Sequence, residues 1–118
     1  MHDFRRLEIW QDGIALAAHI YAITAQLPKS ERYGLTTQIR RAAASVPSNI
    51  AEGAGRGGRK EMARFLQIAL GSLSEMESHL VMAVTLEFLA DEDLPVETIR
   101  SLRNRILRLH DQLTGARP

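Results

Sequence analysis

The chain has no cysteine, which excludes disulfide bonds, thiolate metal sites and thiol-based catalysis. It also has no apolar run of the roughly 18 residues that a membrane span needs, and its N-terminus lacks the apolar stretch of a signal peptide. Its four histidines do not show the spacing of metal ligands, and no Ser, His and Asp set indicates catalysis. We therefore predict a cytoplasmic protein that is not an enzyme and that uses no metal, cofactor or membrane.

The 118 residues suit one domain, which would bury about two thirds of the surface of the unfolded chain. Apolar residues recur at steps of three and four in four segments, and no segment alternates as a strand would. This periodicity predicts helices over about 4–27, 35–55, 59–89 and 95–114. Four helices joined by short loops predict an all-α protein, an antiparallel up-down-up-down four-helix bundle over residues 1–118.

Two of the predicted helices have more apolar surface than the interior of one bundle requires. In the first helix we assign the line through Leu7, Trp10, Ile14 and Tyr21 to the core, which leaves a second apolar stripe on the opposite side. The third helix has a second stripe as well. The residues of these additional stripes are Ile9, Leu16, Ile20, Ile23, Ile68, Met82 and Leu86. They predict the interface of a homo-oligomer, unless the bundle itself covers both faces.

Charge is strongly segregated along the chain, although the net charge is only +1. Residues 38–64 contain six basic and two acidic residues, and residues 65–98 contain seven acidic and no basic residues. Only two of the 15 cationic residues are lysines, and the planar guanidinium of arginine suits both carboxylate and phosphate. The basic segments therefore predict either a phosphate-binding surface or ion pairs within the bundle. For Glu77 and Glu87 we expect ion pairs with arginines of the fourth helix.

The predicted second helix contains a proline and a polar seam. Pro47 cannot donate to the carbonyl of Ala43, so we expect the helix to kink, or to break and restart near Ser48 and Asn49. The seam beside its apolar line consists of Gln38, Arg41, Ser45, Ser48, Glu52 and Arg56. Such a seam is either a satisfied polar contact that fixes helix or subunit packing, or a surface for a partner.

A glycine-rich segment, residues 53–58, ends this helix. It is not a phosphate loop of the Walker type, because it lacks the Gly-Lys-Ser/Thr ending and no strand precedes it. Arg56, Arg59, Lys60 and Arg64 nevertheless surround the predicted start of the third helix, where backbone N–H groups attract anions. This arrangement favours contact with nucleic-acid phosphates over catalysis.

Three motifs are distinctive: FRRLEIW from Phe4, YGLTTQIRRAAASVPSNIAEG from Tyr33, and FLQIALGSLSE from Phe65. They resemble the bacterial four-helix-bundle family named after a protein encoded in 23S ribosomal RNA intervening sequences. The resemblance extends over nearly the whole chain, and the central motif is specific. It implies an antiparallel four-helix bundle that assembles as a ring, commonly a pentamer.

This family is similar to the accessory protein of diversity-generating retroelements, a pentameric bundle that associates with nucleic acid and a reverse transcriptase. The similarity implies RNA or DNA, and a protein such as a reverse transcriptase, as partners. The contact residues that it implies are Arg40, Arg41, Arg56, Arg59, Lys60 and Arg64. We therefore predict a ring-like homo-oligomer that binds RNA or DNA through arginine clusters. The alternative is a protein–protein assembly scaffold that does not bind nucleic acid.

Overall fold

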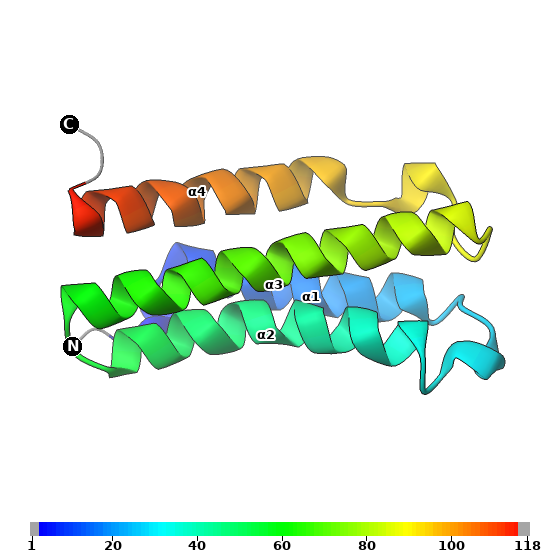
Figure 1. The fold of residues 1–118 in the computed structure, drawn as a ribbon, viewed down its shortest axis with the longest axis horizontal. Coiled ribbons are helices and arrows are strands. Elements are labelled where there is room, and N and C mark those ends of the chain that lie inside the picture. Colours follow the sequence, from blue (N-terminus) through cyan, green and yellow to red (C-terminus); the bar gives the residue numbers. More distant parts are fainter. Residues whose placement is uncertain (1–2, 116–118) are drawn as a thin grey trace.

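The computed structural model describes residues 3–115, and the helices in this part of the chain lie along the long axis of a body of 43 × 25 × 19 Å. Successive helices run in alternating directions, and α1 lies behind α2 and α3 in Figure 1. The four α-helices are α1 (Glu8–Thr24), α2 (Leu35–Gly55), α3 (Arg59–Thr85) and α4 (Val96–Thr114). The prediction of an all-α protein with four helices is confirmed.

Four helix boundaries differ from the prediction, and the two largest differences, of four residues each, come from local backbone motifs. Residues Phe4–Arg6 form a 3₁₀ turn, η1, capped by the carboxylate of Asp3, so α1 begins only at Glu8. At the other end of the bundle, α3 ends at Thr85 because Glu87 adopts a left-handed φ of 64°. The N–H groups of Glu87 and Phe88 then donate to the carbonyls of Val84 and Ala83, at 2.9 and 2.8 Å, in a Schellman motif.

α2 continues through Pro47, so the expected break and restart do not occur. The ring of Pro47 is buried against α1, where a Cβ built on Gly13 would lie 3.3 Å from the Cβ of Pro47. Two residues later, the amide of Asn49 donates to the carbonyl and the hydroxyl of Ser45, at 2.8 and 2.9 Å. Close packing and this side-chain bonding stabilise a helix that lacks the N–H of residue 47.

The core uses the stripe of α1 that we assigned to a subunit interface. The buried residues of this stripe include Ile9, Leu16, Ile20 and Ile23. In contrast, Ile14 and Tyr21, which we assigned to the core, are each 45% exposed. The core assignment is therefore wrong for Ile14 and Tyr21, whereas Leu7 and Trp10 of the same line are partly buried against the core. The assignment of the first four residues to a subunit contact is corrected with it, because their own chain covers them.

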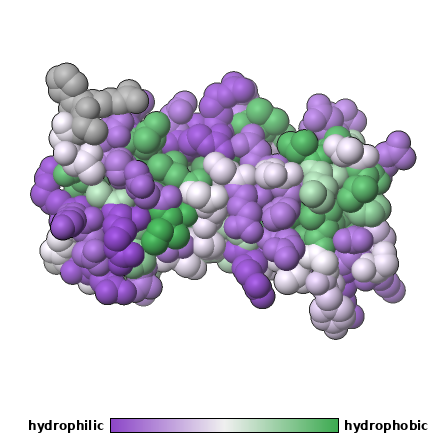
Figure 2. Space-filling model, viewed as in Figure 1, coloured by the Kyte–Doolittle hydropathy of each residue, from purple (hydrophilic) through white to green (hydrophobic). Residues whose placement is uncertain are grey.

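The other three predicted interface residues, Ile68, Met82 and Leu86, lie on the outside of α3 and are 41–50% exposed. Figure 2 shows apolar surface gathered where α3 leads into α4. Within the described residues, nothing covers this stripe. Its role in a contact between subunits stays a prediction.

α2 and α3 pack tightly at Gly53, where a Cβ would lie 2.8 Å from the Cβ of Phe65. We expect Gly53→Ala to lower the free energy of unfolding by about 1–3 kcal/mol, because the added methyl group overpacks this contact. Gly71→Ala is the matched control, since a Cβ on Gly71 in α3 meets nothing within 4 Å. It is expected to raise stability by about 0.5–1 kcal/mol through helix propensity. Urea denaturation measures both, and changes of the same sign would contradict this explanation.

Candidate nucleic-acid interface

The turn between α2 and α3 brings four predicted contact residues to one end of the bundle. These residues, Arg56, Arg59, Lys60 and Arg64, are all exposed, and we call them the basic cluster. Gly57 has a φ of +86°, which residues with a Cβ rarely adopt, and Gly58 is extended. The two glycines therefore let the chain reverse between α2 and α3 within three residues. The predicted position of the cluster around the start of α3 is confirmed.

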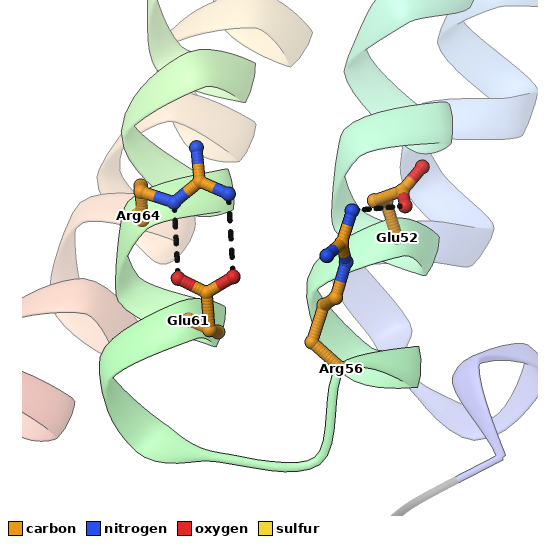
Figure 3. Close-up of polar contacts among 4 residues, drawn as sticks. All are labelled: Glu52, Arg56, Glu61 and Arg64. Atoms are coloured by element: carbon orange, nitrogen blue, oxygen red, sulfur yellow. Dashed lines mark hydrogen bonds and ion pairs between the residues drawn. The ribbon is translucent and has the colours of Figure 1, made fainter.

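Two members of the basic cluster are paired with carboxylates (Figure 3). The guanidinium of Arg56 donates to Glu52 at 3.1 Å, and that of Arg64 makes two bonds to Glu61, at 3.0 and 3.2 Å. The hydrogen bond from Arg64 lowers the pKa of Glu61 below its ordinary value of 4.5, and Glu61 in turn raises the pKa of Arg64. Both pairs are open to water, so each contributes little to stability and can exchange its carboxylate for another anion.

Phe65 connects these two arginines, and the sequence analysis missed its role. Its ring centroid lies 5.2 Å from the guanidinium carbon of Arg56 and 4.4 Å from that of Arg64. The side chain is only 8% exposed, although it lies outside the main hydrophobic core. Phe65 thus holds both guanidinium groups over one aromatic ring by cation–π contact. Its neighbour Leu66 faces the core.

Arg59 and Lys60 differ in what they contact. The guanidinium of Arg59 donates to the carbonyls of Gln112 and Leu113, at 3.0 and 3.4 Å, where α4 leaves its last carbonyls unpaired. Arg59 therefore fastens the end of α4 to the start of α3. Lys60 makes no ion pair or hydrogen bond with any side chain or backbone group of residues 3–115. Its ammonium group is available to a ligand.

An open groove of about 590 Å³ lies between the first turns of α3 and the last turns of α4. Its polar lining consists of Arg59, Lys60, Arg64, Gln67, His110 and Thr114. No carboxylate lines it. The groove therefore presents cations and neutral polar groups at a helix N-terminus, an arrangement that favours an anion such as phosphate.

The other two predicted contact residues, Arg40 and Arg41, lie elsewhere, near the opposite end of α2 and roughly 24 Å from Arg56 along the helix. The guanidinium of Arg40 donates to the hydroxyl of Thr24 and the carbonyl of Tyr21, each at 3.0 Å. It thereby joins the end of α1 to the start of α2. Arg41 is exposed and has no ion pair or hydrogen bond within the described chain. The structure thus does not bring the six residues into one site.

Much of the polar seam of α2 is engaged inside the chain. The hydroxyls of Ser45 and Ser72 lie 2.8 Å apart and connect α2 to α3. Further along the seam, Glu52 holds Arg56. Ser45 thus makes a contact that fixes helix packing, as the structural alternative expects, whereas Glu52 and Arg56 pair on the surface of α2. Gln38, Arg41 and Ser48 face solvent.

Most of the arginines of α4 are engaged in ion pairs. Arg103 binds Glu77 at 2.6 Å, which confirms that predicted pair, and Arg105 binds Asp12 of α1. Arg100 pairs with Glu97 at 2.8 Å. Glu87 ends α3 instead of pairing, so its predicted ion pair is wrong. Because these bonds neutralise much of α4, the α2–α3 turn is the more open basic surface.

Within residues 3–115, no three His, Asp or Glu side chains gather as metal ligands would. None of the helices in this range combines the length and hydropathy of a membrane span.

Comparison with known proteins agrees with this fold. A solved structure similar to this chain is that of a protein with unknown function from the S23 ribosomal protein family of Bacteroides thetaiotaomicron. The two share 21% sequence identity with a TM-score of 0.64, over 92% of this chain and 96% of that chain. No curated protein matches the sequence. The sequence model of the 23S rRNA-intervening sequence protein family matches residues 5–115, so the chain belongs to that family.

Proposed function

We propose that this protein is a non-enzymatic, cytoplasmic homo-oligomer, a ring of four-helix bundles with five subunits, that binds RNA or DNA through the basic cluster. The observation that carries the proposal is the groove at the start of α3, which three cationic side chains line without a carboxylate. RNA is the first ligand to test, because the family takes its name from intervening sequences of 23S rRNA.

Each member of the cluster has a distinct role in this proposal. Lys60 contacts phosphate directly, because it has no partner within the described residues. Arg56 and Arg64 exchange their exposed carboxylate partners for phosphate, which accepts the same two parallel hydrogen bonds from a guanidinium. Arg59 keeps α4 in place and so maintains the groove.

Oligomerisation would multiply these contacts. The exposed apolar side chains of α3 and the exposed Ile14 and Tyr21 of α1 offer two separate faces for neighbouring copies. Two different faces on one subunit suit a closed ring, in which each copy contacts the next. Repetition of a weak phosphate site around a ring raises the overall affinity by avidity.

The test is fluorescence anisotropy with a labelled single-stranded RNA and a DNA of the same sequence, titrated at low and moderate salt. We expect wild-type protein to bind, and Lys60→Ala/Arg64→Ala to bind at least about tenfold more weakly, with a shallower dependence on salt. Arg100→Ala is the matched control for Arg64. Like Arg64, Arg100 is an exposed arginine that pairs with a glutamate three residues earlier in its helix. It lies outside the basic cluster. The binding of Arg100→Ala is expected to equal that of wild type.

Two outcomes would overturn the proposal: no binding of either nucleic acid at low salt, or equal binding by wild type and the double variant. Either outcome would leave the protein–protein scaffold as the better explanation. The two carboxylates that neutralise Arg56 and Arg64 are the observation in its favour.

A further inference from the structure

The turn between α1 and α2 forms a second basic surface, at the opposite end of the bundle from the basic cluster (Figure 1). Residues 25–41 contain Lys29, Arg32, Arg40 and Arg41, with Glu31 as their only acidic residue. The carboxylate of Glu31 points to the start of α2 and accepts a hydrogen bond from the N–H of Leu35 at 3.1 Å. It caps that helix and forms no ion pair with Lys29, Arg32, Arg40 or Arg41.

Tyr33 stands out in this turn because its side chain is almost wholly in water. It is 89% exposed, whereas the other exposed large hydrophobic residues are 41–52% exposed. Its one ring contact within residues 3–115 is with the guanidinium of the preceding Arg32, 5.8 Å from the ring centroid. Keeping an aromatic ring out of the core gives up about 1.5–3 kcal/mol of burial energy, so the ring contributes little to the fold of this chain.

A pocket of about 350 Å³ adjoins the ring through Arg32. Its polar side chains are those of Thr24, Lys29, Arg32, Thr36 and Arg40, and no carboxylate lines it. Arg40 is already held in place by its bonds to α1, so it needs little ordering when it meets a ligand. The Thr24 hydroxyl already donates to the carbonyl of Ile20, so the groups left for a ligand are three cations and the hydroxyl of Thr36, a set that suits a phosphate group.

We infer that the α1–α2 turn binds single-stranded nucleic acid, with one unpaired base stacked on Tyr33 and the neighbouring phosphate in the pocket of Lys29, Arg32 and Arg40. An exposed ring needs the open face of a base, and a duplex covers those faces by stacking. The acidic residues Asp91–Asp93 lie in the α3–α4 turn at the same end, so the strand approaches from the α1–α2 side. The site extends the proposed function and does not share residues with the basic cluster.

The experiment uses single-stranded RNA and DNA 12-mers that contain 2-aminopurine, together with the corresponding duplexes. The fluorescence of this base falls when it stacks. Tyr33→Ala is expected to weaken single-strand binding by about tenfold and to abolish the quenching, while duplex binding stays at the wild-type level. Tyr33→Phe keeps the aromatic face and is expected to behave as wild type. Tyr33→Leu keeps apolar bulk without that face and is expected to behave as Tyr33→Ala.

The outcomes separate this inference from the proposed function. If wild type binds nucleic acid and Tyr33→Ala changes neither affinity nor quenching, the second site is overturned while the basic cluster stands. If Tyr33→Leu binds like wild type, or if Tyr33→Ala changes the oligomeric mass, the ring makes an apolar or subunit contact, and the inference is overturned as well. Quenching that persists in Lys60→Ala/Arg64→Ala supports a site separate from the cluster. Absence of all binding by wild type overturns both.

Discussion

Ile20→Ala is expected to lower the free energy of unfolding by about 2–5 kcal/mol, whereas Ile14→Ala is expected to lower it by less than about 1 kcal/mol. The two variants lose the same atoms from the same helix. Ile20 is completely buried and Ile14 is 45% exposed, so only the first variant leaves a cavity. Urea denaturation at low protein concentration measures the difference for the separate chain.

This comparison tests which face of α1 packs inward. A larger loss for Ile14→Ala than for Ile20→Ala would contradict the packing of α1 and would restore the core line expected from the sequence. Equal losses would mean that both stripes are covered in solution, one by the chain itself and one by a neighbouring copy. Dilution identifies the second case. The part of the stability that comes from a subunit interface disappears at low protein concentration, whereas the part that comes from the core does not.

The sequence predicted four helices because each one repeats apolar residues at helical spacing over several turns. It did not show which face of α1 packs inward, because both faces are apolar and repeat at the same helical spacing. The side chains themselves contained a clue. The buried stripe consists of Ile and Leu, whereas the other one contains Tyr21, which is 45% exposed and whose hydroxyl needs a partner when it is buried.

The end of α3 and the course of α2 depended on contacts that local patterns do not reveal. Glu87 ends α3 in a left-handed conformation that glycine usually adopts, so no glycine marked the boundary. Pro47 stays inside α2 because Gly13, far away in the sequence, leaves room for its ring. A rule for isolated helices therefore predicts a break where tertiary packing prevents one.

The candidate site was predictable in position but not in chemistry. The glycines and cations at residues 53–64 located the basic cluster correctly. Spacing alone did not reveal that Arg59 caps α4, that Glu61 holds Arg64, or that Phe65 lies beneath two guanidinium groups. Arg59 meets the end of α4 and Arg56 meets Phe65 across the α2–α3 turn, so spacing along one helix does not show these contacts. Glu61 and Arg64 lie three residues apart within α3, a spacing at which such pairs form. Together these contacts decide which cations stay available to a ligand.

Met82→Glu and Leu86→Glu are each expected to convert the proposed oligomer to single chains. Both residues lie on the outer stripe of α3 and are about half exposed, so the separate chain tolerates a carboxylate there. Burial of an unpaired charge in a contact between subunits costs several kcal/mol, and each loss of about 1.4 kcal/mol weakens association about tenfold. Val81→Glu is the matched control. The side chain of Val81 is 52% exposed, but it points about 100° around the helix from that of Met82. Sedimentation velocity measures the mass of all three variants.

The same variants connect assembly to nucleic-acid binding. A single-chain Leu86→Glu protein keeps the basic cluster, since the two ends of α3 are roughly 40 Å apart. If the ring supplies avidity, this variant loses about 10²- to 10⁴-fold in affinity for a long RNA but keeps its affinity for a short oligonucleotide that reaches only one subunit. Equal affinities of wild type and variant for the long RNA would show that one bundle suffices. A wild-type protein that sediments as a single chain would remove the ring, because the apolar stripe of α3 would then simply face water.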